Sequence, residues 1–136
     1  MKKRVVLGAV SLFSFLTLFC ISSCENPVGT TRDVAINDVS FTVDTTYFSA
    51  SSSELVASGQ AKNNGTEAIT SPWYVEAQFY SDSTLTVKLG GNFTKITVPL
   101  SQGTSAMWTI RFSSQNVNEA DYPYFRLSDL RAIYKR

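Results

Sequence analysis

The sequence predicts an all-β protein, and three observations support that prediction. Of the 136 residues, 43% are hydrophobic and 12% are aromatic, which is enough for the core of one globular domain. After the N-terminal segment, no window keeps the 3.6-residue period of an amphipathic helix. Short runs of β-branched and aromatic residues alternate with a period of two instead, and clusters of Ser, Asn, Asp and Gly separate them. This alternation is typical of antiparallel strands.

The first 23 residues have the organisation of a secretory signal peptide. A basic start, Met1-Lys2-Lys3-Arg4, precedes an apolar run over residues 5–21, and small residues follow. A retained transmembrane helix is the alternative, because a 17-residue run lies at the lower edge of spanning length. A cleaved signal is favoured, since no basic cluster follows the run and a polar stretch with Pro27 and Gly29 ends it.

The end of this segment, Ile21-Ser22-Ser23-Cys24, resembles a bacterial lipobox. Members of that family usually have Leu at the first of these positions and Gly or Ala at the third. The resemblance implies that Cys24 is diacylated and becomes the N-terminus of the mature chain. Cys20 fits poorly, because bulky Phe19 precedes it. Two or more acyl chains anchor a protein stably where one is marginal, so we expect the membrane to be a partner through these chains.

Lipidation at Cys24 leaves the mature chain without a thiol, because Cys20 departs with the signal. Nine basic and eleven acidic residues follow Ser23, and no basic cluster is apparent among them. We therefore expect no nucleic-acid partner. The lipobox implies the bacterial cell envelope, and Glu25, in place of the aspartate that retains some lipoproteins at the inner membrane, favours the outer membrane.

Three segments follow from these patterns: a lipoprotein signal peptide (1–23), a lipidated tether (24–32) and one β domain (33–136). The tether is polar and contains Pro27 and Gly29, which suits a short flexible spacer. Within the domain, seven strands are expected over residues 34–43, 54–62, 73–80, 85–89, 93–98, 106–112 and 124–134. Seven strands in about 100 residues indicate an antiparallel sandwich.

The alternation also assigns the core and the connections. One face of each of two strands is expected to be buried: Trp73, Val75, Ala77 and Phe79, and then Trp108, Ile110 and Phe112. The turn signal at residues 63–66 predicts a hairpin between the second and third strands. Gly59 predicts a bulge or a close approach by an aromatic ring. Residues 116–121 are compatible with one helical turn, and Ser128-Asp129 with a break or kink in the last strand.

Four short motifs follow one another between residues 54 and 112: Ala57-x-Gly59-x-Ala61-x-Asn63, Phe79-Tyr80-Ser81-Asp82, Val98-Pro99-Leu100-x-x-Gly103 and Trp108-Thr109-Ile110-Arg111-Phe112. Their order resembles that of the FxLYD-type domain of bacterial envelope lipoproteins. Ser81 is an extra residue relative to the family pattern, and Gly103 lacks the usual preceding proline. The resemblance implies an immunoglobulin-like, seven-stranded antiparallel β-sandwich after the lipoprotein signal, with no catalytic residues.

The residues themselves give no sign of an enzyme. Histidine is absent, the carboxylates are scattered, and the serines at positions 49–53 lack an activating base. Asp33, Asp38 and Asp44 do not have the spacing of a calcium loop. Glu119 and Asp121 are expected to cap a loop. We therefore expect no enzymatic activity, no catalytic residue, no metal site and no cofactor.

One surface is a candidate for binding. Tyr74, Glu76, Gln78 and Tyr80 alternate with core residues on one strand, and Arg111 is expected to join them as a polar partner. Exposed tyrosines anchor protein partners or stack on sugars, although many do neither. The favoured function is a membrane-anchored, non-enzymatic module that mediates protein or envelope contacts. The alternative is a small-ligand or glycan-binding lipoprotein that uses the tyrosine face.

Overall fold

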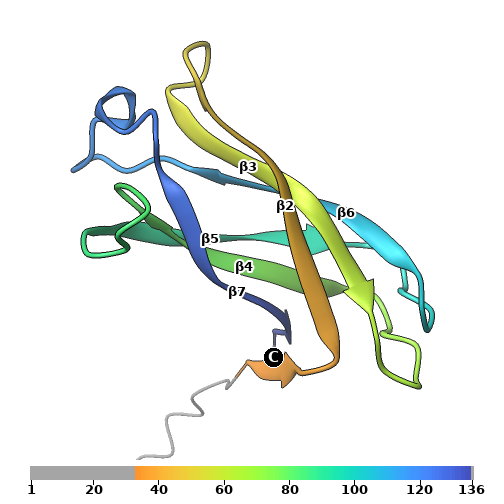
Figure 1. The fold of residues 1–136 in the computed structure, drawn as a ribbon. Helices are drawn as coiled ribbons and strands as arrows, with labels where there is room; N and C mark the ends of the chain where they lie inside the picture. Colours follow the sequence, from red (N-terminus) through yellow and green to blue (C-terminus); the bar gives the residue numbers. More distant parts are fainter. Residues whose placement is uncertain (1–32, 136) are drawn as a thin grey trace, which may run out of the picture. The chain divides into compact units, whose positions relative to one another are not determined.

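The structure is a computed structural model that describes residues 33–135 (Figure 1). The elements are β1 (Val34–Ile36), β2 (Val39–Ser49), β3 (Glu54–Asn63), β4 (Trp73–Tyr80), β5 (Lys88–Ile96), β6 (Ser105–Phe112), the 3-10 turn η1 (Glu119–Asp121) and β7 (Arg126–Tyr134). The predicted signal peptide, Cys24 and tether lie outside the described residues. Within the described range, no helix has the length and hydropathy needed to cross a membrane.

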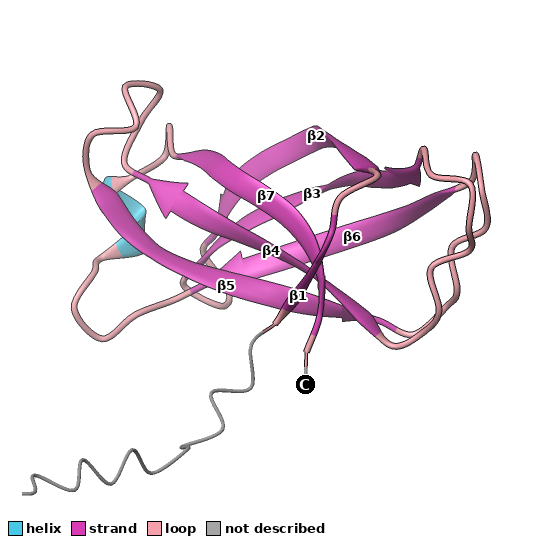
Figure 2. Ribbon diagram, turned by 90° about the horizontal axis from the view of Figure 1, so that it is seen from below, coloured by secondary structure: helices cyan, strands magenta, loops and turns pink. Residues whose placement is uncertain are grey.

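Seven strands form two antiparallel sheets, as the sequence predicts (Figure 2). The larger sheet has the order β1-β7-β4-β5 and the smaller has the order β2-β3-β6. In immunoglobulin lettering the smaller sheet is A-B-E, and the larger is F-C-C′ with β1 beside strand F, where strand G of an immunoglobulin lies. The all-β, immunoglobulin-like sandwich is therefore confirmed.

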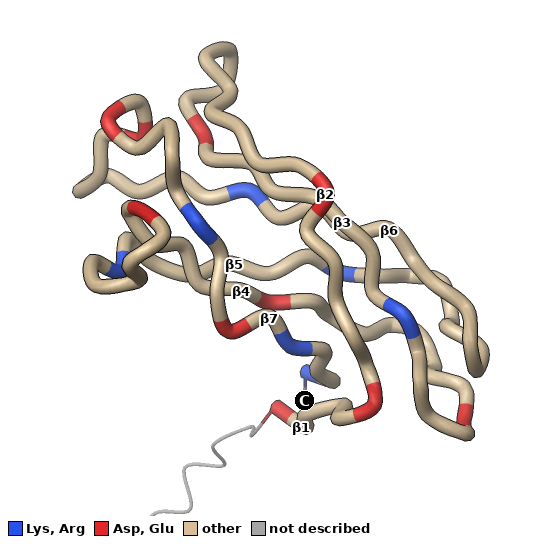
Figure 3. Tube along the Cα trace, viewed as in Figure 1, with Lys and Arg blue, Asp and Glu red and all other residues tan. Residues whose placement is uncertain are grey.

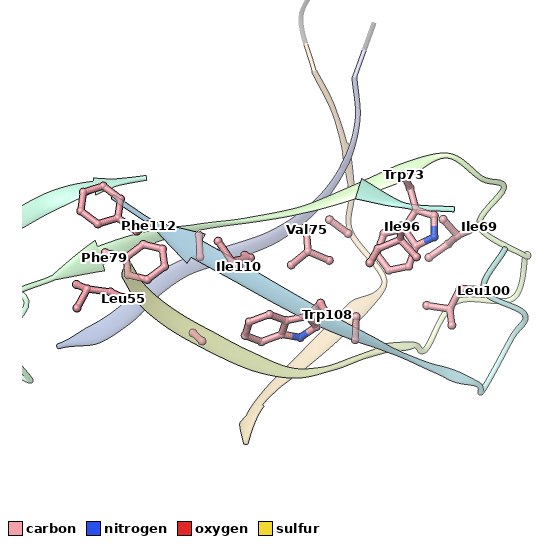
Figure 4. Close-up of a cluster of buried hydrophobic side chains, with 14 of the residues drawn as sticks. Leu55, Ile69, Trp73, Val75, Phe79, Ile96, Leu100, Trp108, Ile110 and Phe112 are labelled. Carbon is pink, nitrogen blue, oxygen red and sulfur yellow. The ribbon is translucent and has the colours of Figure 1, made fainter. Parts of the chain in front are cut away.

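The predicted core is confirmed as well (Figure 4). All seven side chains assigned to the interior are buried, and Trp73 from β4 and Trp108 from β6 are the largest of them. The indole N–H of Trp73 donates to the carbonyl of Val98 at 3.0 Å. Phe79 stacks on both Phe112 and Phe125, with ring centroids 5.2 and 5.6 Å apart. Five aromatic rings thus lie among the aliphatic side chains of the interior between the sheets.

Gly59 combines both features that its position predicts. A Cβ here would collide with the main-chain carbonyl of Thr42 and would lie 2.8 Å from the Trp108 ring. The register of β2 against β3 shifts between Val43 and Thr45, opposite this glycine. The bare backbone of Gly59 lets the Trp108 ring of the neighbouring strand β6 approach closely, and the bulge in β2 lies beside it.

Three of the predicted strands are wrong in their boundaries. The predicted strand 34–43 divides at Asn37-Asp38, because β1 pairs with β7 in one sheet and β2 pairs with β3 in the other. The predicted strands 85–89 and 93–98 are one strand, β5. The gap between the two predicted strands contains Gly90 and Gly91, which lie where Phe112 and Gln78 leave no room for a Cβ. The physical cause is side-chain crowding from other strands.

The predicted hairpin at residues 63–66 is also wrong. β3 and β4 belong to different sheets, so the segment between them is a crossover. Asn63 anchors it: its buried side-chain amide donates to the carbonyls of Glu67 and Leu100 at 2.8 and 2.9 Å, and its Oδ1 accepts from the N–H of Gly65. The turn residues are present, but they change sheets instead of reversing one strand onto the next.

The C-terminal part contains both local features that the sequence left open. Residues 119–121 form a single 3-10 turn, and the carboxylate of Glu119 accepts the N–H of Ser114 at 2.7 Å, which caps the loop before it. The last strand is continuous, but Asp129 has φ 56° and the pairing with β4 shifts between Glu76 and Gln78. β7 is therefore one strand with a bulge at the predicted kink.

Candidate functional site

The outer face of β4 forms the centre of the candidate site. Tyr74, Glu76, Gln78 and Tyr80 are all half-buried and alternate with fully buried neighbours. Because β4 is a central strand of the larger sheet, side chains of β5 and β7 flank these four on both sides. We call this surface the β4 face.

Arg111 does not lie on the β4 face. It belongs to β6 in the smaller sheet, pairs in register with Val56 and forms an ion pair with Glu54 at 3.1 Å. The sequence pattern correctly predicts that the side chain of Arg111 points away from the core. Each sheet of a sandwich has its own outer face, however, and Arg111 lies on that of the smaller sheet. The arginine next to Glu76 is Arg131 of β7, which forms an ion pair with it.

A shallow depression of about 400 Å³ lies in the middle of the β4 face. Its lining residues are Glu76, Gln78, Lys88, Asp129, Leu130 and Arg131. Gln78 lies flat over β5 because Gly91 beneath it has no side chain, and a Cβ there would come within 2.5 Å of the amide oxygen. The depression thus offers amide, carboxylate and cationic groups side by side.

Tyr80 borders one end of this depression. Its hydroxyl donates to a carboxylate oxygen of Asp129 at 3.2 Å, which connects β4 with the bulge of β7. Desolvation, together with the hydrogen bond and charge of Asp129, raises the pKa of Tyr80 above its ordinary value. The tyrosine is therefore held in place as a neutral hydrogen-bonding group.

Tyr74 lies at the other end, in an aromatic pair. The ring of Phe93 from β5 meets it edge to face with centroids 5.8 Å apart. The ammonium of Lys135 lies 3.1 Å from the Phe93 centroid and 5.5 Å from that of Tyr74. Six residues of extended strand, about 20 Å, separate Tyr74 from Tyr80, so the two tyrosines bracket the depression instead of lining one pocket.

The fold brings together on this face cations that are far apart in the sequence (Figure 3). Residues 33–135 contain seven basic and ten acidic side chains. Five of the seven basic ones belong to the β4 face by register or contact: Lys88, Lys95, Arg126, Arg131 and Lys135. The carboxylates of Glu76 and Asp129 lie among them, and Asp33 lies opposite Lys135 at the edge of the sheet. Sequence reasoning missed this cluster, because its members come from two strands and the chain end.

The other hollows have a different character. One of about 270 Å³, near β1, is bordered by the carboxylates of Asp38 and Glu67. Another of about 380 Å³ is bordered mainly by serines of two loops. Among the described residues, no three His, Cys, Asp or Glu side chains gather as a metal site would require. The β4 face is the surface that combines aromatic rings, cations and a depression.

These features define a class: an antiparallel β-sandwich with immunoglobulin-like strand order and a basic, aromatic face on its larger sheet. No protein-family model matches the chain, and neither curated proteins nor solved structures include a match. The resemblance to FxLYD-type domains therefore rests on the sequence features alone.

Proposed function

We propose that this chain is a lipid-anchored, non-enzymatic module of the bacterial cell envelope, which works by contact through the β4 face. The observation that carries the proposal is the grouping of Tyr74, Phe93 and five cations on one sheet surface of an otherwise acidic domain. Aromatic and arginine side chains are enriched at the energetic centres of protein interfaces. The FxLYD-like pattern of the sequence, which implies an immunoglobulin-like sandwich without catalytic residues, supports the non-enzymatic part of the proposal.

Anchoring through Cys24 gives such a surface its setting. The acyl chains hold the domain at the membrane, and residues 24–32 act as a tether. A tethered module meets envelope partners at a raised effective concentration, so weak contacts suffice. The outer membrane is the location that Glu25 favours.

The contact role is tested with a Tyr74→Ala/Tyr80→Ala double variant of the full chain. We expect it to fold, because both side chains lie outside the core, and to lose a partner in crosslinking at the membrane. Tyr47→Ala is the matched control, since Tyr47 is 46% exposed on β2 of the other sheet. Retention of every partner by the double variant would contradict the proposal, and so would turnover of a substrate by the purified chain.

Lipidation is tested separately by metabolic labelling with a radioactive fatty acid. We expect the label on the parent and on Cys20→Ala but not on Cys24→Ala, because the thiol of Cys24 is the proposed acceptor. Label that persists on Cys24→Ala would contradict lipidation at Cys24, and it would not affect the proposal that the β4 face is a contact surface.

The depression favours a second candidate, a glycan-binding or small-ligand-binding lipoprotein. Its lining contains the amide of Gln78, two carboxylates and two cations, which can exchange hydrogen bonds with several hydroxyl groups. The sugar rings of a glycan stack on aromatic faces such as that of Phe93, which is 46% exposed. Binding of purified oligosaccharides by the full chain distinguishes this candidate from a protein contact.

A further inference from the structure

The charge of the described domain is strongly one-sided. The two basic residues outside the β4 face, Lys62 and Arg111, lie on the outer face of the smaller sheet. The larger sheet has five cations against Glu76, Asp129 and, next to β1, Asp33, although acidic residues outnumber basic ones in the domain. A net positive surface on a net acidic domain attracts anions to one side only.

Most of these cations have no carboxylate partner of their own. Of the five, only Arg131 forms an ion pair within residues 33–135, and its partner is Glu76. Lys88 and Lys95 are exposed on β5, at opposite ends of the face. Arg126 uses one guanidinium nitrogen to donate to the carbonyls of Tyr124 and Phe125, which fixes its position beside Tyr80. The cations are thus available to an external anion.

Aromatic rings and hydrogen-bonding groups lie between the cations. Tyr74 and Phe93 form a pair whose faces already attract the ammonium of Lys135. The depression between this pair and Tyr80 contributes an amide, two carboxylates and a guanidinium. The carboxylates are engaged, Glu76 with Arg131 and Asp129 with the Tyr80 hydroxyl, and each retains acceptor capacity for a hydroxyl group.

We infer that the β4 face binds an acidic polysaccharide, a linear glycan that carries carboxylate or phosphate groups. This inference rests on the proposed function and specifies its partner. The cations pair with the acidic groups, the part of the Phe93 ring that Lys135 leaves exposed stacks on a sugar, and the depression accepts hydroxyl groups. The face extends for about 20 Å between the two tyrosines, a length that suits several units of a polymer.

An anionic membrane surface is the competing occupant, and the geometry disfavours it. Lipid headgroups meet basic residues over a flat area, so attraction depends on charge and not on a polar depression. An acidic peptide would satisfy the cations but would leave the hydroxyl-binding groups unused. The combination of rings, cations and hydroxyl acceptors is what a charged sugar requires.

The test measures binding of polygalacturonate to the full-length chain in non-ionic detergent. We expect affinity that falls with added salt, and a Lys88→Glu/Lys95→Glu variant that binds at least about tenfold more weakly, because each reversal replaces attraction with repulsion. The matched control is Lys62→Glu/Arg111→Glu, which applies the same change to the other sheet and is expected to stay within about twofold of the parent. Equal losses in both variants would overturn the inference.

Three further ligands separate sugar recognition from charge alone. We expect polyglutamate and neutral dextran to bind weakly, and phosphatidylglycerol in the micelles to leave polygalacturonate binding in place. Phe93→Ala is expected to weaken binding severalfold, whereas Phe93→Tyr retains it. Polyglutamate as strong as polygalacturonate, displacement by phosphatidylglycerol, or an unaffected Phe93→Ala variant would each overturn the inference. The proposed function survives those outcomes if the Tyr74→Ala/Tyr80→Ala variant still loses its envelope crosslink.

Discussion

Trp73 and Trp108 fill neighbouring parts of the core but differ at one atom. The indole nitrogen of Trp73 has the carbonyl of Val98 as its acceptor. That of Trp108 is buried without an acceptor in the part of the chain that the structure describes. A buried donor without a partner costs free energy, so the two rings contribute differently although both are almost fully buried.

This difference predicts a contrast between conservative variants. Trp108→Phe removes an unpaired N–H, whereas Trp73→Phe leaves the Val98 carbonyl without its donor. We expect Trp73→Phe to lower the free energy of unfolding by about 1–2 kcal/mol more than Trp108→Phe. Trp108→Ala removes the whole ring from the core and is expected to lower the free energy of unfolding by about 3–5 kcal/mol. Urea unfolding measures all three, and a Trp108→Ala change near neutral would contradict the burial of this ring.

Tyr80 predicts a pH dependence at the alkaline end. Its pKa is raised in the folded chain, so the unfolded chain loses the phenol proton first as the pH rises. The contribution of Tyr80 to stability is therefore complete below about pH 10, the pKa of an unperturbed tyrosine, and declines above it. Comparison of urea unfolding at about pH 8 and about pH 11 should show a smaller loss for Tyr80→Phe than for the parent. Identical losses would mean that Tyr80 does not contribute.

At the scale of elements, alternation predicted where strands lie but not how they pair. Residues 73–80 and 106–112 were predicted closely, because large apolar side chains mark one face of each strand. Pairing depends on contacts far apart in sequence. β7 lies beside β4, and Gly90-Gly91 continues β5 because Phe112 and Gln78 cover it. The local sequence around residues 90–91 contains no information about those neighbours.

Asn63 shows how a crossover is stabilised. Besides its side-chain bonds, its main-chain N–H donates to Thr104 and its carbonyl accepts from Gly103, so one residue joins the crossover to the turn before β6. Asn63→Ala leaves the buried carbonyl of Leu100 without its side-chain donor. We expect it to lower the free energy of unfolding by about 2–4 kcal/mol.

Asn64 is the control for that variant. Its exposed side chain donates to the Ser40 hydroxyl at 2.8 Å, and water can replace this bond. Asn64→Ala should therefore cost less than about 1 kcal/mol. Equal effects of the two substitutions would show that the buried amide of Asn63 does not hold the crossover.

At the scale of the whole molecule, the two outer faces of the sandwich differ in chemistry. The β4 face contains five cations and a pair of aromatic rings, while the smaller sheet presents Ser, Thr and Gln with one exposed tyrosine, Tyr47, and one exposed methionine, Met107. The sequence predicted the β4 residues of the candidate site from their alternation. It did not predict the surrounding cations, because Lys88, Lys95 and Arg131 come together only through the order of the strands.

Site-specific photocrosslinking in cells tests the contact face most directly. A benzophenone amino acid replaces Gln78 at the centre of the β4 face in one full-length variant, and Thr109 on the outer face of β6 in the other. Position 78 is half-buried on a central strand of the larger sheet, and position 109 is exposed on an edge strand of the smaller one. The control position is therefore the more accessible of the two, and a preference for position 78 reflects the face. We expect irradiation to give a covalent adduct from position 78 and none from position 109. Adducts of equal yield from both positions, or from position 109 alone, would contradict the assignment of the β4 face as the contact surface.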